Sequence, residues 1–168
     1  MEDLDARIRT ALISVNPTTK NPAWHGAPTA LGVLRGVSSA TAVWRPYPDA
    51  NNIREIALHI AFWENSVANR ISGENVRVGF EQRKTGWAIR SDSIDAIQWK
   101  NEMGLVKAAH ARLTDSVISF DPRLLDQPAG KRTARNAMGL IHGAAEHSLY
   151  HTAQIEMIKT LAEHGCMK

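Results

Sequence analysis

The segment from Ala134 to Glu163 carries the longest helical pattern in the chain, and it restricts the possible folds more than any other feature. Apolar residues recur along it at the spacing of an α-helix, no proline interrupts it, and Gly165 follows its end. Antiparallel neighbouring helices would bury such an apolar stripe. The segment therefore predicts a helical protein built around one long element.

Four further segments show the same pattern. Proline, asparagine, serine or glycine marks where each one begins or ends. The predicted helices run from Asp3 to Val15, from Pro28-Thr29 through Val37 to Pro46, from Asn51 or Asn52 to Gly73, and from Ser91 or Ser93 to Asp121-Pro122. Strand patterns are weak, and residues 76–91 predict an irregular excursion across the surface. The sequence thus predicts an all-α bundle of one domain, residues 1–168, with long connecting loops.

Composition and motifs argue against several classes of function. Hydrophobic residues make up 43% and charged residues 22% of the 168 positions, ordinary values for a globular chain with a sizeable core. The formal charge is +3, but lysine and arginine are dispersed, so nucleic-acid binding is not predicted. The sequence contains no Gly-rich phosphate loop and no nucleophile elbow. Nucleotide hydrolysis and serine-type catalysis therefore lack their usual motifs.

The amino terminus and the single cysteine predict the compartment. Acidic residues follow Met1 where a secretory signal would be basic, and no apolar stretch is long enough to span a bilayer. Cys166 cannot form an intrachain disulfide, which fits a reducing compartment. A cytoplasmic protein without membrane contact is expected, with Cys166 as an inert tail residue rather than a reactive thiol.

His147 and His151 are the most informative residues for function. Two imidazoles four positions apart lie on one face of a helix, about a turn apart, which suits a single metal ion. About 0.3 such pairs are expected by chance among 7 histidines, so the spacing alone is a weak motif. On a helical wheel both fall on the side of Leu140, Ala144 and Ile158. An inward pair of imidazoles requires partners, and for this pair alone metal binding and satisfied core packing weigh about equally.

His59 is the predicted third ligand. It lies among Ile56, Ile60 and Trp63 on the apolar side of its helix, where an unpaired imidazole is unfavourable. Three neutral imidazoles leave coordination positions open for water or substrate, as in a reactive metal site. A divalent metal ion is therefore the expected cofactor, and water or a thiol on it would be acidified.

Three other residues are candidates for catalytic roles. Glu55, one turn before His59, can orient an imidazole or act as a base, although stabilising the helix amino terminus is the favoured role. Gln154 can contact a bound water or the neighbouring backbone, with pocket and structural roles weighted equally. Tyr150 can line the pocket with its hydroxyl, although a core position is favoured.

The remaining aromatic residues and histidines receive structural interpretations. Core or pocket-wall positions are predicted for Trp63, Trp87 and Trp99. Exposed positions are predicted for His110, His142 and His164. His25, beside Trp24, can lie near the metal, although surface or packing use is favoured.

The histidine motifs resemble a known family. The helix segment from Ile53 to Glu64 with His59 at its centre, followed by residues 139–142 and then by His147, His151 and Gln154, is similar to the DinB-like superfamily. The segments 24–28 and 44–46 also resemble connecting segments of that family, so the resemblance covers nearly the whole chain. Thr152-Ala153 stands where many relatives carry Arg-Gly. The pocket wall beside His151, and with it the substrate, is therefore expected to differ from theirs.

This resemblance implies a four-helix bundle with a metal triad, usually assigned as nickel or zinc, on His59, His147 and His151. Bacillithiol transferases and mycothiol-dependent isomerases share the bundle, which implies an enzyme acting with a low-molecular-weight thiol. A homodimer is also expected, and the first helix offers apolar residues for it. A metal-dependent hydrolase and a non-catalytic metal-binding stress-response module are the alternatives. Thiol, amide and ester substrates together with metal analysis would separate the three.

Overall fold

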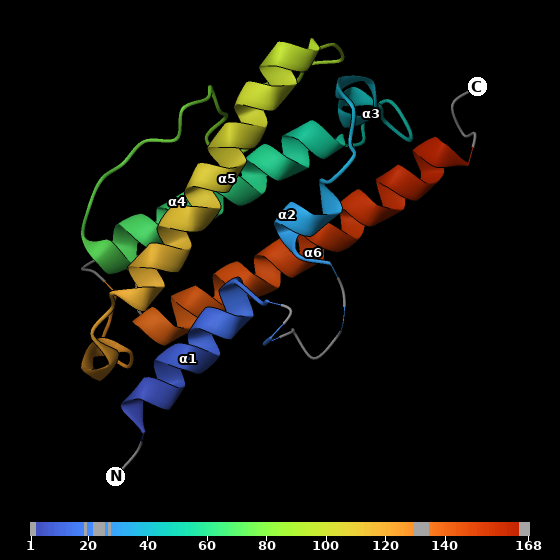
Figure 1. Ribbon diagram of the computed structural model, residues 1–168. Helices are drawn as coiled ribbons and strands as arrows, with labels where there is room; N and C mark the ends of the chain where they lie inside the picture. Colours follow the sequence, from blue (N-terminus) through green and yellow to red (C-terminus); the bar gives the residue numbers. More distant parts are fainter. Residues whose placement is uncertain (1–2, 19, 22–25, 27, 130–134, 165–168) are drawn as a thin grey trace.

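Helices are the only regular elements of the residues that the structure describes, which confirms the all-α prediction (Figure 1). The computed structural model describes residues 3–18, 20–21, 26, 28–129 and 135–164. The elements are α1 (Leu4–Val15), α2 (Ala30–Val33), α3 (Ser39–Val43), α4 (Ile53–Ser72), α5 (Ala96–Ile118), the 3₁₀ helix η1 (Pro122–Leu124) and α6 (Ala137–Glu163). Within these ranges, no helix has both the length and the apolar character that a membrane crossing demands.

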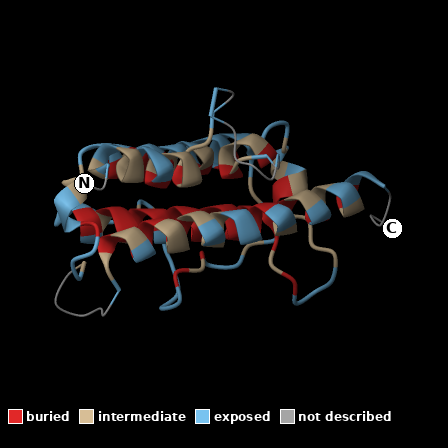
Figure 2. Ribbon diagram, turned by 90° about the horizontal axis from the view of Figure 1, so that it is seen from below, coloured by how far each residue is buried: buried red, intermediate tan, exposed pale blue. Residues whose placement is uncertain are grey.

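The four long helices α1, α4, α5 and α6 form a bundle in which α4 is central. Its most extensive interfaces are with α5 and α6, and α1 packs against α5 and α6 (Figure 1). Figure 2 shows buried residues on the faces that the helices turn toward one another and exposed residues on the outer faces. The apolar face of α1, with Ala11 and Val15 buried, is used inside the bundle.

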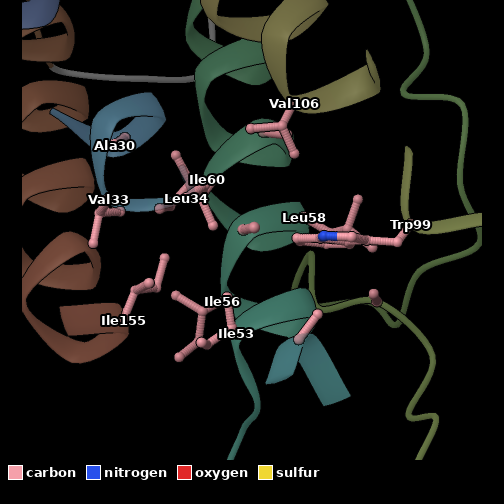
Figure 3. Close-up of a cluster of buried hydrophobic side chains, with 14 of the residues drawn as sticks. Ala30, Val33, Leu34, Ile53, Ile56, Leu58, Ile60, Trp99, Val106 and Ile155 are labelled. Carbon is pink, nitrogen blue, oxygen red and sulfur yellow. The ribbon is translucent and has the colours of Figure 1, made fainter. Parts of the chain in front are cut away.

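Two apolar clusters fill the bundle and fix the direction of its helices. In the first, Ile56 and Ile60 of α4 face Val33 of α2 and Ile155 of α6 (Figure 3). The second joins the other half of α4 to α1, α5 and the amino half of α6, and includes Val67, Ile71, Leu113, Ala137, Leu140 and Ala144. The carboxyl half of α6 thus meets the start of α4 and its amino half meets the end, so α4 and α6 run antiparallel.

Local sequence signals set the ends of α4. The Asn52 side chain accepts from the backbone N–H of Glu55, and the Glu55 carboxylate accepts from the backbone N–H of Asn52, a capping box. Gly73 ends the helix at φ 77°, a left-handed conformation that glycine adopts at little cost. Both ends agree with the sequence prediction, since capping depends on residues close together in the chain.

Two predicted helix boundaries were wrong. The predicted second helix is divided into α2 and α3, because Gly36 takes a φ of 75° between them and turns the chain. The fifth helix begins at Ala96 and not at the serines, because the Asp95 side chain accepts from the backbone N–H of Gln98. Ser91 instead donates to the carbonyl of Ser93 in the preceding loop.

The prediction that His110 is exposed was also wrong. His110 is 8% exposed, and its Nδ1 lies 3.2 Å from Oε1 of Glu64, which is 3% exposed. Ser148 of α6 donates to the same carboxylate oxygen at 3.1 Å. The hydrogen bond with Glu64 raises the pKa of His110, opposed by burial. A polar contact between α4, α5 and α6 therefore lies inside an otherwise apolar interface. His142 is partly buried, and His164 is exposed as predicted.

Replacing His110 by leucine removes the partner of a buried carboxylate. We expect His110→Leu to lower the free energy of unfolding by about 3 kcal/mol, because the Glu64 charge is left uncompensated. The raised pKa of His110 means that its contribution is fully present below the ordinary value of about 6.5 and is lost as pH rises through the raised value. Urea unfolding at a series of pH values measures this dependence.

The double variant Glu64→Leu, His110→Leu is the control for that experiment. It removes both polar groups and should recover most of the lost free energy. A His110→Leu protein as stable as the wild type at every pH would contradict an interacting buried pair.

Candidate metal centre

Three histidines from two helices converge inside the bundle. His59 comes from α4, His147 and His151 come from successive turns of α6, and one ring nitrogen of each lies within 4.8 Å of the others. The Nε2 atoms of His147 and His151 are 3.1 Å apart. His151 is 4% exposed, His59 is 5% exposed, and His147 is partly buried. The structure therefore brings together all three predicted ligands, from the inward faces that the sequence indicated.

Burial keeps these imidazoles neutral. It lowers the pKa of His59 to about 4, with a smaller lowering by the charge of His151. Burial lowers the pKa of His147 to about 4 as well, and the other two rings lower it further. It also lowers the pKa of His151, opposed by a hydrogen bond to Gln154. Neutral imidazoles carry the free lone pair that a metal ion requires.

Gln154 fixes the orientation of His151. Its Oε1 lies 2.6 Å from Nδ1 of His151, and its Nε2 donates to the Tyr150 hydroxyl at 3.1 Å. An amide oxygen only accepts, so Nδ1 of His151 holds the proton and Nε2 presents its lone pair to the cluster. Gln154 thus has a contact with a predicted ligand. Tyr150 is 62% exposed, so the favoured core position was wrong, and its hydroxyl supports Gln154 from outside.

An aromatic wall encloses His59. Trp87 stacks on it with ring centroids 3.8 Å apart and planes 2° apart, and Trp63 meets it edge-on at 6.3 Å. Trp87 belongs to the connection between α4 and α5, which was predicted to be a surface excursion. Its neighbour Gly86 is buried at φ 79°, and a Cβ there would overlap the ring of Phe62. Glycine therefore lets this connection fold against α4 and place Trp87 on His59.

Glu55 is engaged at the amino end of α4. Its carboxylate accepts two hydrogen bonds from Arg45, at 2.5 and 2.8 Å, and one from the backbone N–H of Asn52. The described contacts of Glu55 include none with His59, one turn away. They fit the favoured role at the helix end, and they occupy both carboxylate oxygens that a base would need.

A groove between α4 and α6 opens beside the histidines. Its volume is about 400 Å³. Its described lining residues are His59, Trp63, Ser66, Val67 and Arg70 from α4, Thr85 from the following connection, Arg135 before α6, and Leu140, Gly143, Ala144 and His147 from α6. Two predicted ligands thus lie on its wall, so a molecule in the groove can reach the histidine cluster.

The histidine cluster fits a divalent transition-metal ion. The Nδ1 atoms of His59 and His147 are buried without a hydrogen-bond partner among the described residues, which is unfavourable for polar atoms that bind nothing. Convergent neutral imidazoles suit transition metals such as zinc, nickel, copper and iron. The cluster is the one group of three or more His, Cys, Asp or Glu found at ligand spacing in the described part of the chain.

Sequence reasoning missed several groups near the site. It predicted Trp87 on the core or the pocket wall but did not predict its stacking on His59, and it did not find the polar pair of Glu64 and His110. The Gly86-Trp87 sequence was visible, but only the packing of this connection against α4 brings Trp87 onto His59. The predictions for Trp24, His25 and Cys166 lie outside the described residues.

The depressed histidine pKa values predict an acid-sensitive apoprotein. The unfolded chain binds protons near pH 6.5 that folded His59 and His147 accept only near pH 4. The free energy of unfolding should therefore fall as pH decreases through this window. His147→Gln removes one such group and should make the fall shallower, whereas His164→Gln, at the exposed end of α6, should follow the wild type. Urea unfolding of metal-free protein measures both, and equal slopes in all three would contradict the prediction.

Gly86 provides a test of the aromatic wall. Gly86→Ala should lower the free energy of unfolding by about 1–3 kcal/mol, because alanine is strained at this φ and its Cβ meets Phe62. The displaced connection should also move Trp87 off His59, which NMR detects as a loss of the ring-current shift on the His59 ring protons.

Gly104→Ala is the matched control for Gly86→Ala. Gly104 is an exposed glycine within α5, and a Cβ there meets no atom within 4 Å. Alanine should leave the His59 signals in place and stabilise the helix slightly. A Gly86→Ala protein with wild-type stability and wild-type His59 shifts would disprove the role given to this glycine.

Sequence comparison identifies the family. A family model described as the DinB superfamily matches residues 27–155, which include all three histidines of the cluster. Searches of curated proteins and of solved structures found no significant match. The match covers most of the chain and agrees with the helical fold and the histidine cluster. The chain therefore belongs to the DinB superfamily.

Proposed function

We propose that this protein is a metal-dependent enzyme that activates a small thiol for transfer to an electrophile, with His59, His147 and His151 holding nickel or zinc. The observation that carries the proposal is that three neutral imidazoles lie at ligand spacing and that two of them, His59 and His147, line an open groove. Three protein ligands leave coordination positions for an exogenous molecule.

The surroundings of the histidines favour a thiol over water as the activated group. The described residues lining the groove include no carboxylate, and Glu55 is held by Arg45, so a general base for hydrolysis has no evident candidate. A bound divalent ion supplies Lewis acidity that lowers the pKa of a coordinated thiol or water. A free thiol ionises near pH 8.5, against about 15.7 for water, so a thiol needs far less assistance.

The chain's own residues would position the reactants. Gln154 fixes the ring of His151, and Trp87 and Trp63 exclude water from one side of His59. In the proposed reaction the thiol sulfur forms a bond to an electrophilic carbon, the bond from that carbon to its leaving group breaks, and the thiol proton passes to solvent. The small thiol partner and the homodimer stay predictions.

Metal binding is the first test of this function. Protein purified without exposure to a nickel column should contain about one divalent ion per chain, and zinc or nickel in hundredfold excess over Kd should add about 2.7 kcal/mol to the free energy of unfolding. His151→Ala should abolish this binding. Gln154→Leu should weaken it about ten- to hundredfold, because Gln154 only orients a ligand.

His142→Ala is the control, since it removes a partly buried histidine of the same helix from outside the cluster. Circular dichroism of each variant separates loss of the site from loss of the fold. A metal-free wild-type protein whose stability does not respond to zinc or nickel would exclude the proposed function.

Chemistry is tested on the metal-loaded protein. A panel of small thiols with an aromatic halide electrophile should give thioether product that depends on His59, His147 and His151. Turnover of amides or esters without thiol would instead identify the hydrolase. A metal-loaded protein inactive with both panels would favour the non-catalytic module.

A further inference from the structure

The groove between α4 and α6 has two chemically different ends. On α4, its lining residues follow one helical face from His59 to Arg70. On the antiparallel α6 side, they run back from His147 to Arg135. The histidine cluster therefore lies at one end of the groove, and the chain positions of Arg70 and Arg135 lie toward the other end.

Helix geometry gives the scale of the groove. Arg70 lies eleven residues beyond His59, which corresponds to about 16 Å along the axis of α4. The Arg135 side chain reaches back along α6, because its Nη1 lies 4.0 Å from the position that a Cβ on Gly143 would occupy. Gly143 precedes His147 by about one helical turn. A ligand that extends a few bonds from the histidines thus comes within reach of a guanidinium.

The charged side chains that line the groove, Arg70 and Arg135, are both positive. None of its described lining residues is acidic, and in the described part of the chain Arg70 forms no ion pair. Ser66 and Thr85 add hydroxyl donors to the lining. The rest of the wall is largely apolar, with Val67, Leu140 and Ala144 buried in the second apolar cluster. Two arginines that line a largely apolar groove suit a carboxylate or a similar anion on a hydrocarbon chain.

We propose that Arg70 and Arg135 form an anion-binding subsite, so that the molecule taken by this groove carries an anionic group at the end opposite its metal-binding atom. This inference rests on the proposed function for the metal-binding end only. The anionic group of the ligand is inferred from Arg70, Arg135 and the apolar lining of the groove. The two arginines thus select among small thiols by charge and by length.

Two thiols of equal length test the subsite. Isothermal titration calorimetry of the zinc-loaded protein compares ω-mercaptohexanoate with ω-mercaptohexanol, which differ in the charge of the distal group. The carboxylate should bind at least about tenfold more tightly, as expected for a charge-assisted hydrogen bond. Raising the salt concentration should reduce this preference.

Arginine variants locate the preference. Arg70→Gln and Arg135→Gln should each remove most of it while leaving the affinity for ω-mercaptohexanol unchanged. Arg35→Gln is the matched control, because it removes the same charge from an exposed position that does not line the groove, and it should keep the full preference. Mercaptoacetate, which is too short to reach Arg70, should be insensitive to Arg70→Gln.

Specific results would overturn the subsite. Equal affinity of the wild type for the two long thiols would do so, as would a preference that survives in both arginine variants. A loss of mercaptoacetate affinity in Arg70→Gln as large as that for ω-mercaptohexanoate would place the anion elsewhere. Titration with zinc in the absence of thiol measures metal binding independently of the subsite. If zinc does not bind, the proposed function fails, and binding of hexanoate to the metal-free wild type and to Arg70→Gln still decides whether the subsite exists.

Discussion

The burial of α4 dictates which groups must surround this helix. Every residue in the range 52–61 is buried, so each charged side chain there needs a partner inside the chain. Arg54 donates to both carboxylate oxygens of Glu102 on α5, at 2.7 and 2.6 Å, and Arg45 binds Glu55 from the segment after α3. Such forked pairs are directional in a way that apolar contacts are not. They fix the segments that surround α4, the helix that carries His59.

Helix α6 carries polar side chains on two of its faces. One face contributes to the histidine cluster, and the other contributes to the buried contact with Glu64. His147 and His151 face His59, whereas Ser148, next to His147 in the chain, points toward Glu64 and donates to it. Thr152, next to His151, donates to the carbonyl of Ser148 and is buried. The histidine cluster and the buried polar contact of Glu64 therefore share α6, and the packing that positions one also positions the other.

Predictions from local sequence succeeded where the deciding residues are neighbours in the chain. The capping box that starts α4 and the glycine that ends it depend on contacts within a few residues. The inward face of His147 and His151 follows from the period of a single helix. The same reasoning failed at the second predicted helix, because Gly36 takes a positive φ where the periodic pattern continues. It also failed at His110, whose burial depends on a glutamate from another helix.

The helical class, the approximate extent of the long helices and the faces on which the three histidines lie could be predicted from the sequence, because they follow from short-range periodicity and capping. The approach of His59 to the α6 pair, the stacking of Trp87 on His59, and the position of Arg70 and Arg135 on one groove depend on tertiary packing. A helical period fixes the direction of a side chain relative to its own axis. The distance between two helices depends instead on the side chains packed between them and on the connections that join them.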